Sequence, residues 1–417
     1  MKVKTPYILI FLLLVLVSLE AYAHVFLLKE DAISATWLYL LSGILIGIIV
    51  LNRKRTPDRM TYRQSTRYLP WYSILTFILG LIAVPYLAEA FAAMPLDYRR
   101  ADMLPIMQVM GERLLSGANP YDPIPEIWDG MQPIYLPAMW LPYVPAIALD
   151  IDMRWMGALV LLLGCLSLSF TSQRELPLVP TLIVLIPLGL LIYGLTIVNG
   201  DVLTLTEEGI VVGFYLLLAA SLFRNKLGWM VLALTLCTMS RYSLVMWAVM
   251  WVILVYCYED RRKGLRLVFI SALCGVALLI VTRGIAYLDV FISLSGDYLE
   301  DIQSPDHRWK IEPVVKKSLG LAKFFAYEDL PRLHSYFFGV LMLLPALLLG
   351  FYSRFRERLD RRFFLLGSLK LCLVGFYNLL IYPLSYLFYT STFLSVALLY
   401  FYTVASYKKA YKESEAN

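Results

Sequence analysis

Apolar residues gather into long runs along this chain, and charged residues are largely confined to the stretches between them. Most runs reach or approach the ~20 residues that an α-helix needs to cross a bilayer. The pattern therefore predicts an all-α polytopic integral membrane protein, a helical bundle with about 12–13 apolar segments. The runs lie at about 6–28, 34–52, 71–91, 133–149, 155–171, 177–198, 204–223, 228–240, 243–257, 267–287, 333–352, 364–384 and 386–406.

The loops between the runs differ in charge, and this difference predicts their orientation. Arginine and lysine cluster at 53–67, 261–266, 354–362 and in the C-terminal tail. Short loops rich in these residues stay in the cytoplasm by the positive-inside rule. The two longest remaining loops, 92–132 and 288–332, then lie outside, and both hold more acids than bases.

The number of crossings does not fit if every run is a full span. If every run crossed the membrane, the turn at 199–201 would lie inside. The basic loop at 224–226, one span further along, belongs inside, so the turn must lie outside. Four prolines interrupt helical hydrogen bonding in the run 133–149. Either this run is short, bent or re-entrant, or 228–257 is one broken span.

Composition narrows the class of protein. Hydrophobic residues make up 60% of the 417 residues and charged residues 16%, against roughly 45–50% and 25% in soluble domains. This composition excludes disorder and a disulfide scaffold. A nucleic-acid module is excluded as well, because the net charge of +6 comes from short loops between apolar runs. The five cysteines lie in or at the end of apolar runs and the three histidines are scattered, so we expect neither a metal nor a cofactor.

The first outer loop contains a predicted amphipathic helix at 103–115. Its apolar residues recur at helical spacing and include Leu104, Met107, Met110, Leu114 and Leu115. Such a helix suits the membrane interface. Asp102 directly precedes it and has two interpretations that do not exclude one another. It is an N-cap for the helix, or a carboxylate at the membrane surface that takes a proton from an acceptor hydroxyl.

Several short motifs accompany this acid and helix. They are Gly117-Ala118-Asn119-Pro120-Tyr121-Asp122, Tyr135-Leu136-Pro137, and more loosely Asn199-Gly200-Asp201-Val202-Leu203 and Ser240-Arg241-Tyr242-Ser243. Together they resemble glycosyltransferase family 87 of the GT-C superfamily, whose members are integral-membrane transferases that use polyprenyl-phosphate sugars. The last two stretches stand where the family has a Gly-Gln-x-Asn turn and a Lys-Pro-like basic step. The resemblance spans about 71–260, and the C-terminal third matches only in hydropathy.

This resemblance implies a GT-C fold and the inverting transfer of a hexose, often mannose, from a lipid-phosphate carrier outside the cytoplasmic face. It also implies a catalytic aspartate in the first outer loop and no obligatory metal. Asp102 is the better match for this general base, and Asp97 is the runner-up. A second catalytic carboxylate is not required, unlike in retaining glycosidases, because the lipid phosphate is already a competent leaving group.

Arg241 is the candidate cation for the leaving phosphate. It is the only charged residue between Lys226 and Glu259, and an arginine in such a run is costly unless it faces a cavity, a phosphate or the interface. The alternative is an arginine that only anchors a short span at the membrane surface. Lys370 lies near the start of its apolar run, and we expect its side chain to extend to the cytoplasmic face.

Further residues are expected to bind substrate under this resemblance. Arg100, Asn119 and Tyr121 would shape the site beside Asp102. Asp201 stands in the family's turn, and His334 at the end of the second outer loop is a candidate for holding hydroxyl groups.

Three parts are predicted along the chain. A membrane hairpin with a basic cytoplasmic loop covers 1–70, a catalytic membrane core covers 71–260, and a C-terminal membrane region covers 261–417. The expected location is a bacterial-type plasma membrane with the site facing the extracytoplasmic side. The expected partners are a polyprenyl-phosphate sugar donor, a lipid or glycan acceptor and membrane lipids, with no nucleic acid.

Two other classes compete with the transferase. One is a transporter of lipids or small molecules, which is disfavoured by the absence of an evident two-fold repeat and by few charges in mid-span. The other is a non-catalytic envelope-assembly protein, which has no need for an acid beside an interfacial helix.

Overall fold

The computed structural model describes residues 5–55, 70–127, 130–171, 176–292, 308–381 and 384–415. Within these ranges every regular element is a helix, and the only β-type pairs are isolated bridges. The all-α class predicted from the apolar runs is therefore confirmed.

The helices follow one another as α1 (Thr5–Tyr22), η1 (Ala23–Leu27), α2 (Leu28–Glu30), α3 (Ala32–Leu51), α4 (Trp71–Ala93), α5 (Met103–Ser116), α6 (Pro137–Trp140), η2 (Leu141–Tyr143), α7 (Val144–Ala148), α8 (Arg154–Thr171), α9 (Leu178–Tyr193), η3 (Gly194–Val198), α10 (Asp201–Leu205) and α11 (Glu208–Arg224). The C-terminal half continues with α12 (Leu227–Thr238), η4 (Tyr242–Leu244), α13 (Val245–Tyr258), α14 (Arg261–Val281), η5 (Gly284–Tyr287), α16 (Arg308–Lys316), η7 (Leu321–Phe324), η8 (Tyr327–Asp329), α17 (Leu330–Phe355), α18 (Arg361–Leu379), η9 (Ser385–Phe388) and α19 (Tyr389–Glu415).

Eight of the described helical segments are long and apolar enough to cross a bilayer. They are Tyr7–Glu30, Ala32–Leu51, Trp71–Ala93, Leu178–Val198, Arg261–Val281, Tyr327–Phe355, Arg361–Leu379 and Ser385–Tyr407. Shorter apolar helices at Arg154–Ser169, Leu227–Thr238 and Tyr242–Tyr258 accompany them. The chain is therefore a polytopic membrane protein.

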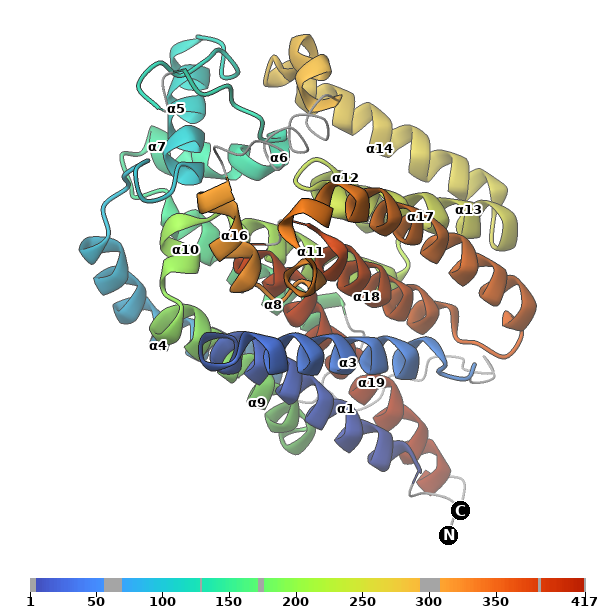
Figure 1. Cartoon of the computed structure of the whole chain (residues 1–417). Coiled ribbons are helices and arrows are strands. Elements are labelled where there is room, and N and C mark those ends of the chain that lie inside the picture. The colour runs from blue at the N-terminus through green and yellow to red at the C-terminus, as the bar shows by residue number, and fades with distance from the viewer. Residues whose placement is uncertain are drawn as a thin grey trace.

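The helices divide into an interior set and a peripheral set. α11, α18 and the first turns of α19 are buried along most of their length, and they lie inside the bundle in Figure 1. α4, α14 and α17 instead expose most of their apolar side chains. Exposed apolar surface of this extent is what a helix facing lipid presents.

The basic loops gather at one end of the bundle, which we call the basic end. Its segments are 52–55, 224–226, 259–263 and 354–361. The backbone N–H of Arg55 donates to the carbonyl of Arg358 at 2.8 Å, and Lys263 Nζ donates to Asn225 Oδ1 at 2.6 Å. We call the opposite end the loop end. Contacts between the loops there are described below, and the assignment of the basic end to the cytoplasm stays a prediction of the positive-inside rule.

The run 133–149 is not a membrane span. Its prolines divide it into the short helices α6, η2 and α7, and it stays at the loop end, where the N–H of Ala138 donates to the carbonyl of Met239 at 2.9 Å. Without this span, the turn at 199–201 falls at the loop end and the segment 224–226 at the basic end. The crossings now fit the charge pattern.

The run 228–257 also deviates from a single span. It forms two antiparallel helices, α12 and α13, that reverse at Ser240 and Arg241. α12 has 12 residues and α13 has 14, which at 1.5 Å per residue is about 18–21 Å, less than the ~30 Å of a hydrocarbon core. A hairpin of this length that starts at the basic end places its tip inside the bundle.

Glycines bring α8 and α11 into close contact. A Cβ atom on Gly164 would lie 2.6 Å from the Cα of Gly213, and one on Gly209 would lie 2.6 Å from the carbonyl oxygen of Gly157. Small residues allow this approach between membrane helices. The packing fixes the start of α11, which carries two adjacent glutamates, against the middle of the bundle.

The expectation that Lys370 extends to the cytoplasmic face is wrong. Lys370 is fully buried, and its Nζ donates to Glu20 Oε1 at 2.5 Å and to the carbonyl and hydroxyl of Ser391 at 2.9 and 2.7 Å. Glu20 Oε2 accepts from Ser395 at 2.8 Å. Because α18 is an interior helix, Lys370 faces α1 and α19 rather than the lipid, and its charge is paired instead of solvated.

Candidate functional site

Arg241 lies at the tip of the α12–α13 hairpin and is almost completely buried. Its backbone is extended between two helices, which directs the side chain toward the start of α11. The guanidinium donates to Glu208 Oε2 at 2.8 Å and to Glu207 Oε1 at 2.7 Å. Both carboxylates are buried, so this is a three-residue charge cluster inside the bundle.

The two glutamates of the cluster differ in how well they are satisfied. Glu208 Oε1 accepts a hydrogen bond from the hydroxyl of Thr390 at 2.6 Å, so both of its oxygens have partners. Glu207 Oε2 has no hydrogen-bond partner among the described residues, although Glu207 is only 3% exposed. A buried unpaired acceptor in a native protein requires an explanation, such as a ligand, a water molecule or a catalytic role.

Asp102 precedes α5 but does not cap it with its side chain. Its backbone carbonyl accepts from the N–H of Ile106 at 2.9 Å, whereas its carboxylate makes no capping hydrogen bond. Of the two interpretations of this acid, the N-cap is therefore not seen. The Asp102 carboxylate is therefore not used to stabilise the start of α5.

The phenol of Tyr135 is subject to the charges of both Asp102 and Glu207. Burial raises the pKa of the Tyr135 phenol well above its ordinary value, and the negative charges of Glu207 and Asp102 act in the same direction. Both carboxylates also interact electrostatically with the phenol of Tyr386, whose hydroxyl lies 3.2 Å from Met103 Sδ. The charges of Asp102 and of the Arg241 cluster, 139 positions apart in the sequence (241 − 102), thus act on the same two tyrosines.

Tyr121 holds the backbone of Tyr135 by a hydrogen bond. Its hydroxyl donates to the carbonyl of Tyr135 at 3.1 Å and accepts from Trp140 Nε1 at 3.3 Å. Burial raises the pKa of Tyr121 to about 12. Tyr121 therefore shapes this region through the backbone of Tyr135.

Asn119 holds the first outer loop to the region after α14. Its side-chain amide donates to Tyr287 Oη at 2.8 Å and to Asp122 Oδ1 at 2.9 Å, and Tyr287 donates to Asp122 at 2.7 Å. This three-residue contact fixes the loop. The Asn-Pro-Tyr-Asp motif therefore attaches the first outer loop to the segment after α14.

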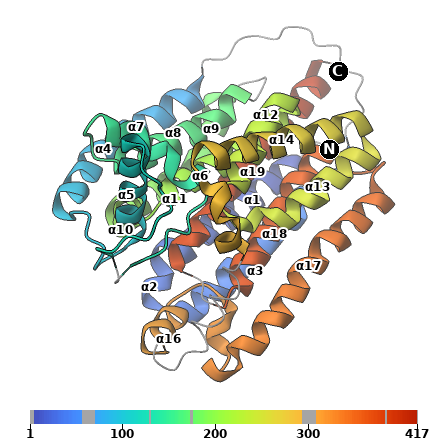
Figure 2. The same cartoon turned by 90° about the horizontal axis from the view of Figure 1, so that it is seen from above.

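The remaining predicted residues lie outside this group of contacts. Arg100 is exposed, and Asp97 uses its carboxylate to accept from the N–H of Arg99 at 3.0 Å. Asp201 is exposed at the start of α10. His334 stacks on Phe338 in α17, and α17 and α5 lie on opposite sides of the bundle in Figures 1 and 2. Their roles in binding stay predictions.

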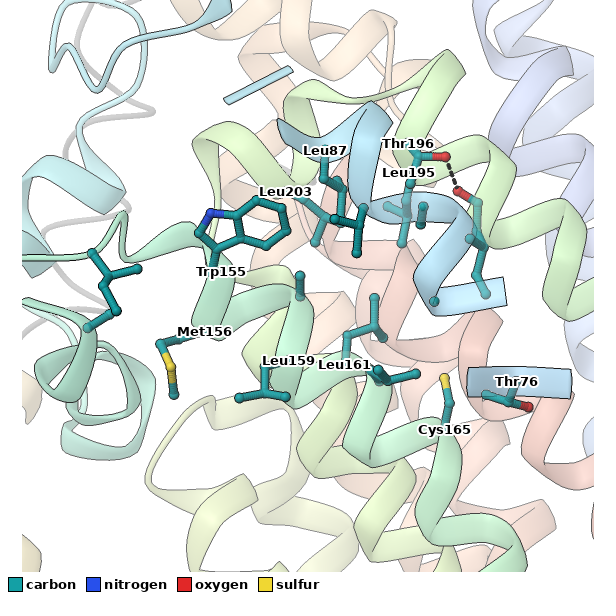
Figure 3. A pocket seen from close by; sticks show the side chains of 18 of the residues that line it. Thr76, Leu87, Trp155, Met156, Leu159, Leu161, Cys165, Leu195, Thr196 and Leu203 are labelled. Atoms are coloured by element: carbon teal, nitrogen blue, oxygen red, sulfur yellow. Dashed lines mark hydrogen bonds between the residues drawn. The ribbon is translucent and has the colours of Figure 1, made fainter. Parts of the chain in front are cut away.

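An apolar cavity of about 410 Å³ lies between α4, α8 and the end of α9. Figure 3 shows Leu87, Trp155 and Leu203 around one part of it and Thr76 and Cys165 around another. Its lining is almost entirely apolar and includes side chains that are exposed on the lipid-facing surface, such as Val84 and Leu159. A chain of hydrocarbon could enter it from the bilayer.

A second space, too small to admit a water molecule, lies between this cavity and the interior of the bundle. It shares Leu161, Leu195 and Leu203 with the cavity and reaches Glu208 and Tyr389. The side chains that line the cavity therefore also surround Glu208. An apolar space leading to polar groups is the arrangement that a lipid with a polar head requires.

The described residues contain no group of three or more histidine, cysteine, aspartate or glutamate side chains that could hold a metal ion. The chemistry that this arrangement offers is proton transfer to a carboxylate and hydrogen bonding to carboxylates and phenols. Such groups act on hydroxyl-bearing substrates.

Glu207 and Glu208 were not predicted from the sequence. The available signal was two adjacent acids at the start of the apolar run 204–223, because ionisable residues in such runs face the bundle interior and pair with opposite charges. Arg241 was considered alone, as a phosphate ligand or a surface anchor. Its partners in the structure are two carboxylates, and phosphate binding by Arg241 stays a prediction.

No protein-family model, curated protein or solved structure matches this chain. The fold and the site define a class: an all-helical, multi-pass membrane protein with a buried charge cluster and an apolar cavity among its helices.

Proposed function

We propose that this protein is a membrane glycosyltransferase that moves a hexose from a polyprenyl-phosphate donor to a hydroxyl group of a lipid or glycan acceptor. The observation that carries the proposal is an apolar cavity whose lining is shared with the surroundings of Glu208, together with two carboxylates, Asp102 and Glu207, whose charges both act on the phenol of Tyr135. A lipid-linked sugar has the matching shape, with a long apolar chain and a polar head.

Asp102 is the general base in this mechanism. Its carboxylate takes the proton of the acceptor hydroxyl while the hydroxyl oxygen attacks the anomeric carbon. The bond from that carbon to the phosphate oxygen breaks, and its electron pair leaves with the phosphate, so the configuration inverts. The absence of a side-chain cap at α5 supports this role, since Asp102 is not committed to the helix.

The phosphate that leaves requires a cation or a group of hydrogen-bond donors. Arg241 uses two of its five N–H groups on Glu208 and Glu207, so it retains donors, but its charge is already balanced by carboxylates. Arg100, two residues before Asp102 and exposed, is the second candidate. Substituting Arg241 and Arg100 one at a time and measuring donor binding shows which of them holds the phosphate.

The direct test is transfer by the purified protein in liposomes. Polyprenyl-phosphate mannose and a mixture of lipid and glycan acceptors are supplied, and product formation is measured with labelled sugar. We expect transfer by the wild-type protein and its loss in Asp102→Asn. No transfer from any polyprenyl-phosphate hexose, under conditions in which the protein is folded, contradicts the proposal.

A transporter is the second candidate function, and one observation favours it. The bundle interior holds more charges than the sequence suggested, namely Glu20, Lys370, Arg241, Glu207 and Glu208. Ionisable residues inside membrane bundles often mark pathways for ions or substrates. Uptake of a labelled solute by the same liposomes without sugar transfer identifies a transporter.

A further inference from the structure

We infer that Glu207 is a substrate-binding carboxylate whose Oε2 atom accepts a hydrogen bond from a hydroxyl group of a neutral sugar. The inference rests on the proposed function for the identity of the ligand as a hexose. It adds a residue that neither the composition nor the motifs of the chain indicated.

The unequal satisfaction of two neighbouring glutamates is the first step of the argument. Glu207 and Glu208 share Arg241 and are equally removed from solvent. Glu208 completes its hydrogen bonds with Thr390, whereas Glu207 Oε2 has no partner among the described residues. A buried carboxylate oxygen without a donor is costly, so a donor from outside the chain is expected to complete it.

The surroundings of Glu207 indicate which donor this is. The Glu207 carboxylate interacts electrostatically with the phenols of Tyr135, Tyr143 and Tyr386. The side chains of Tyr135 and Tyr386 are partly rather than fully buried. Carboxylates accept hydrogen bonds from sugar hydroxyls, and aromatic rings offer apolar faces to sugar rings.

The charge of the cluster excludes a second class of ligand from this position. One guanidinium faces two carboxylates, and Asp102 adds a third carboxylate near Tyr135. A phosphate placed at Glu207 Oε2 would meet an acceptor rather than a donor and would be repelled by like charge. A neutral polyol supplies the missing donor without that repulsion.

The test is the binding of small hexosides to the full-length protein in lipid nanodiscs, measured by saturation-transfer NMR. Methyl mannoside, methyl glucoside and methyl galactoside are the probes. Glu207→Gln keeps the size of the side chain and an oxygen for Arg241, but it removes the charged acceptor. Glu208→Gln is the matched control. It makes the same change beside the same arginine, but both carboxylate oxygens of Glu208 already have hydrogen-bond partners within the protein.

We expect at least one hexoside to bind the wild-type protein, and Glu207→Gln to weaken this binding by about 10- to 100-fold. Glu208→Gln, assayed as folded protein, is expected to retain binding within about threefold. If Glu207→Gln does not fold, Glu207→Asp replaces it; this variant keeps the charge but withdraws the free oxygen, and weaker binding is again expected.

Equal affinity in the wild-type protein and the Glu207 variants overturns the inference, and so does the absence of hexoside binding to the wild type. Equal losses in the Glu207 and Glu208 variants also overturn it, because they indicate a general effect on the cluster. Since no transfer is measured here, a protein that binds hexosides through Glu207 but transfers none contradicts the proposed function alone. Transfer with unchanged hexoside affinity in Glu207→Gln contradicts only the inference.

Discussion

The ammonium group of Lys370 lies 2.5 Å from Glu20 Oε1, although 350 positions separate the two residues in the chain. Both are fully buried, and Ser391 and Ser395 on α19 supply the remaining hydrogen bonds. Three helices, α1, α18 and α19, therefore meet at one buried ion pair. Removing one partner of such a pair leaves an uncompensated charge, which typically costs about 3–5 kcal/mol.

Stability should depend on the Lys370–Glu20 pair as a unit. Lys370→Met and Glu20→Gln are each expected to lower the free energy of unfolding by about 3–5 kcal/mol, because each leaves a buried group unpaired. The double variant should recover most of the loss. Thermal unfolding of detergent-purified wild type, both single variants and the double variant gives the coupling free energy of the pair. Purely additive losses in the double variant contradict a coupled pair.

Topology can be checked by cysteine accessibility from the two sides of the membrane. Residue 119 in the first outer loop is expected to react from outside, and residue 262 at the basic end only from inside, since basic loops resist translocation. The native cysteines are first replaced to remove background. Labelling of 262 from outside without labelling of 119 inverts the orientation and, with it, the location of the proposed site.

Asp102→Asn tests the general base. Asparagine caps a helix about as well as aspartate, and the carboxylate makes no capping bond in any case, so folding should be unchanged. Sugar transfer should fall about 10²- to 10⁴-fold. Asp97→Asn is the control, because Asp97 caps a turn at Arg99; if it abolishes transfer and Asp102→Asn does not, the base is Asp97.

Arg241 distinguishes a structural cation from a phosphate ligand. If its main partners are Glu207 and Glu208, Arg241→Gln leaves two buried acids unpaired and should reduce the amount of folded protein sharply. Arg241→Gln combined with Glu208→Gln should recover folding in part. If Arg241 instead holds the donor phosphate, Arg241→Lys should fold normally and lose donor binding, because lysine lacks the planar fork. Yield of folded protein and specific activity are measured separately.

The apolar cavity is tested by filling it. Ala83 lines the cavity and is buried, so Ala83→Trp should obstruct a bound hydrocarbon chain and lower transfer from a long polyprenyl donor at least about tenfold, equivalent to ~1.4 kcal/mol. Leu163→Trp is the control, since Leu163 is 54% exposed and does not line the cavity. Equal activity of both variants removes the cavity from the donor site.

Much of the fold could be predicted because it is determined locally. A segment in lipid must satisfy its own backbone hydrogen bonds, so apolar runs of sufficient length form helices. The prolines of 133–149 and the single arginine in 228–257 marked the two places where the simple pattern failed. Which of the two deviated required the structure, which shows that both do.

The sequence by itself determined the class of protein, the helical segments, the grouping of basic loops and the acid before α5. Only the tertiary structure decided the partners of the buried charges: Lys370 with Glu20, and Arg241 with Glu207 and Glu208. The physical reason is that membrane helices are apolar on every side, so their periodicity does not indicate which face turns inward. The pairs form between residues 33 to 350 positions apart, and helix packing alone brings them together.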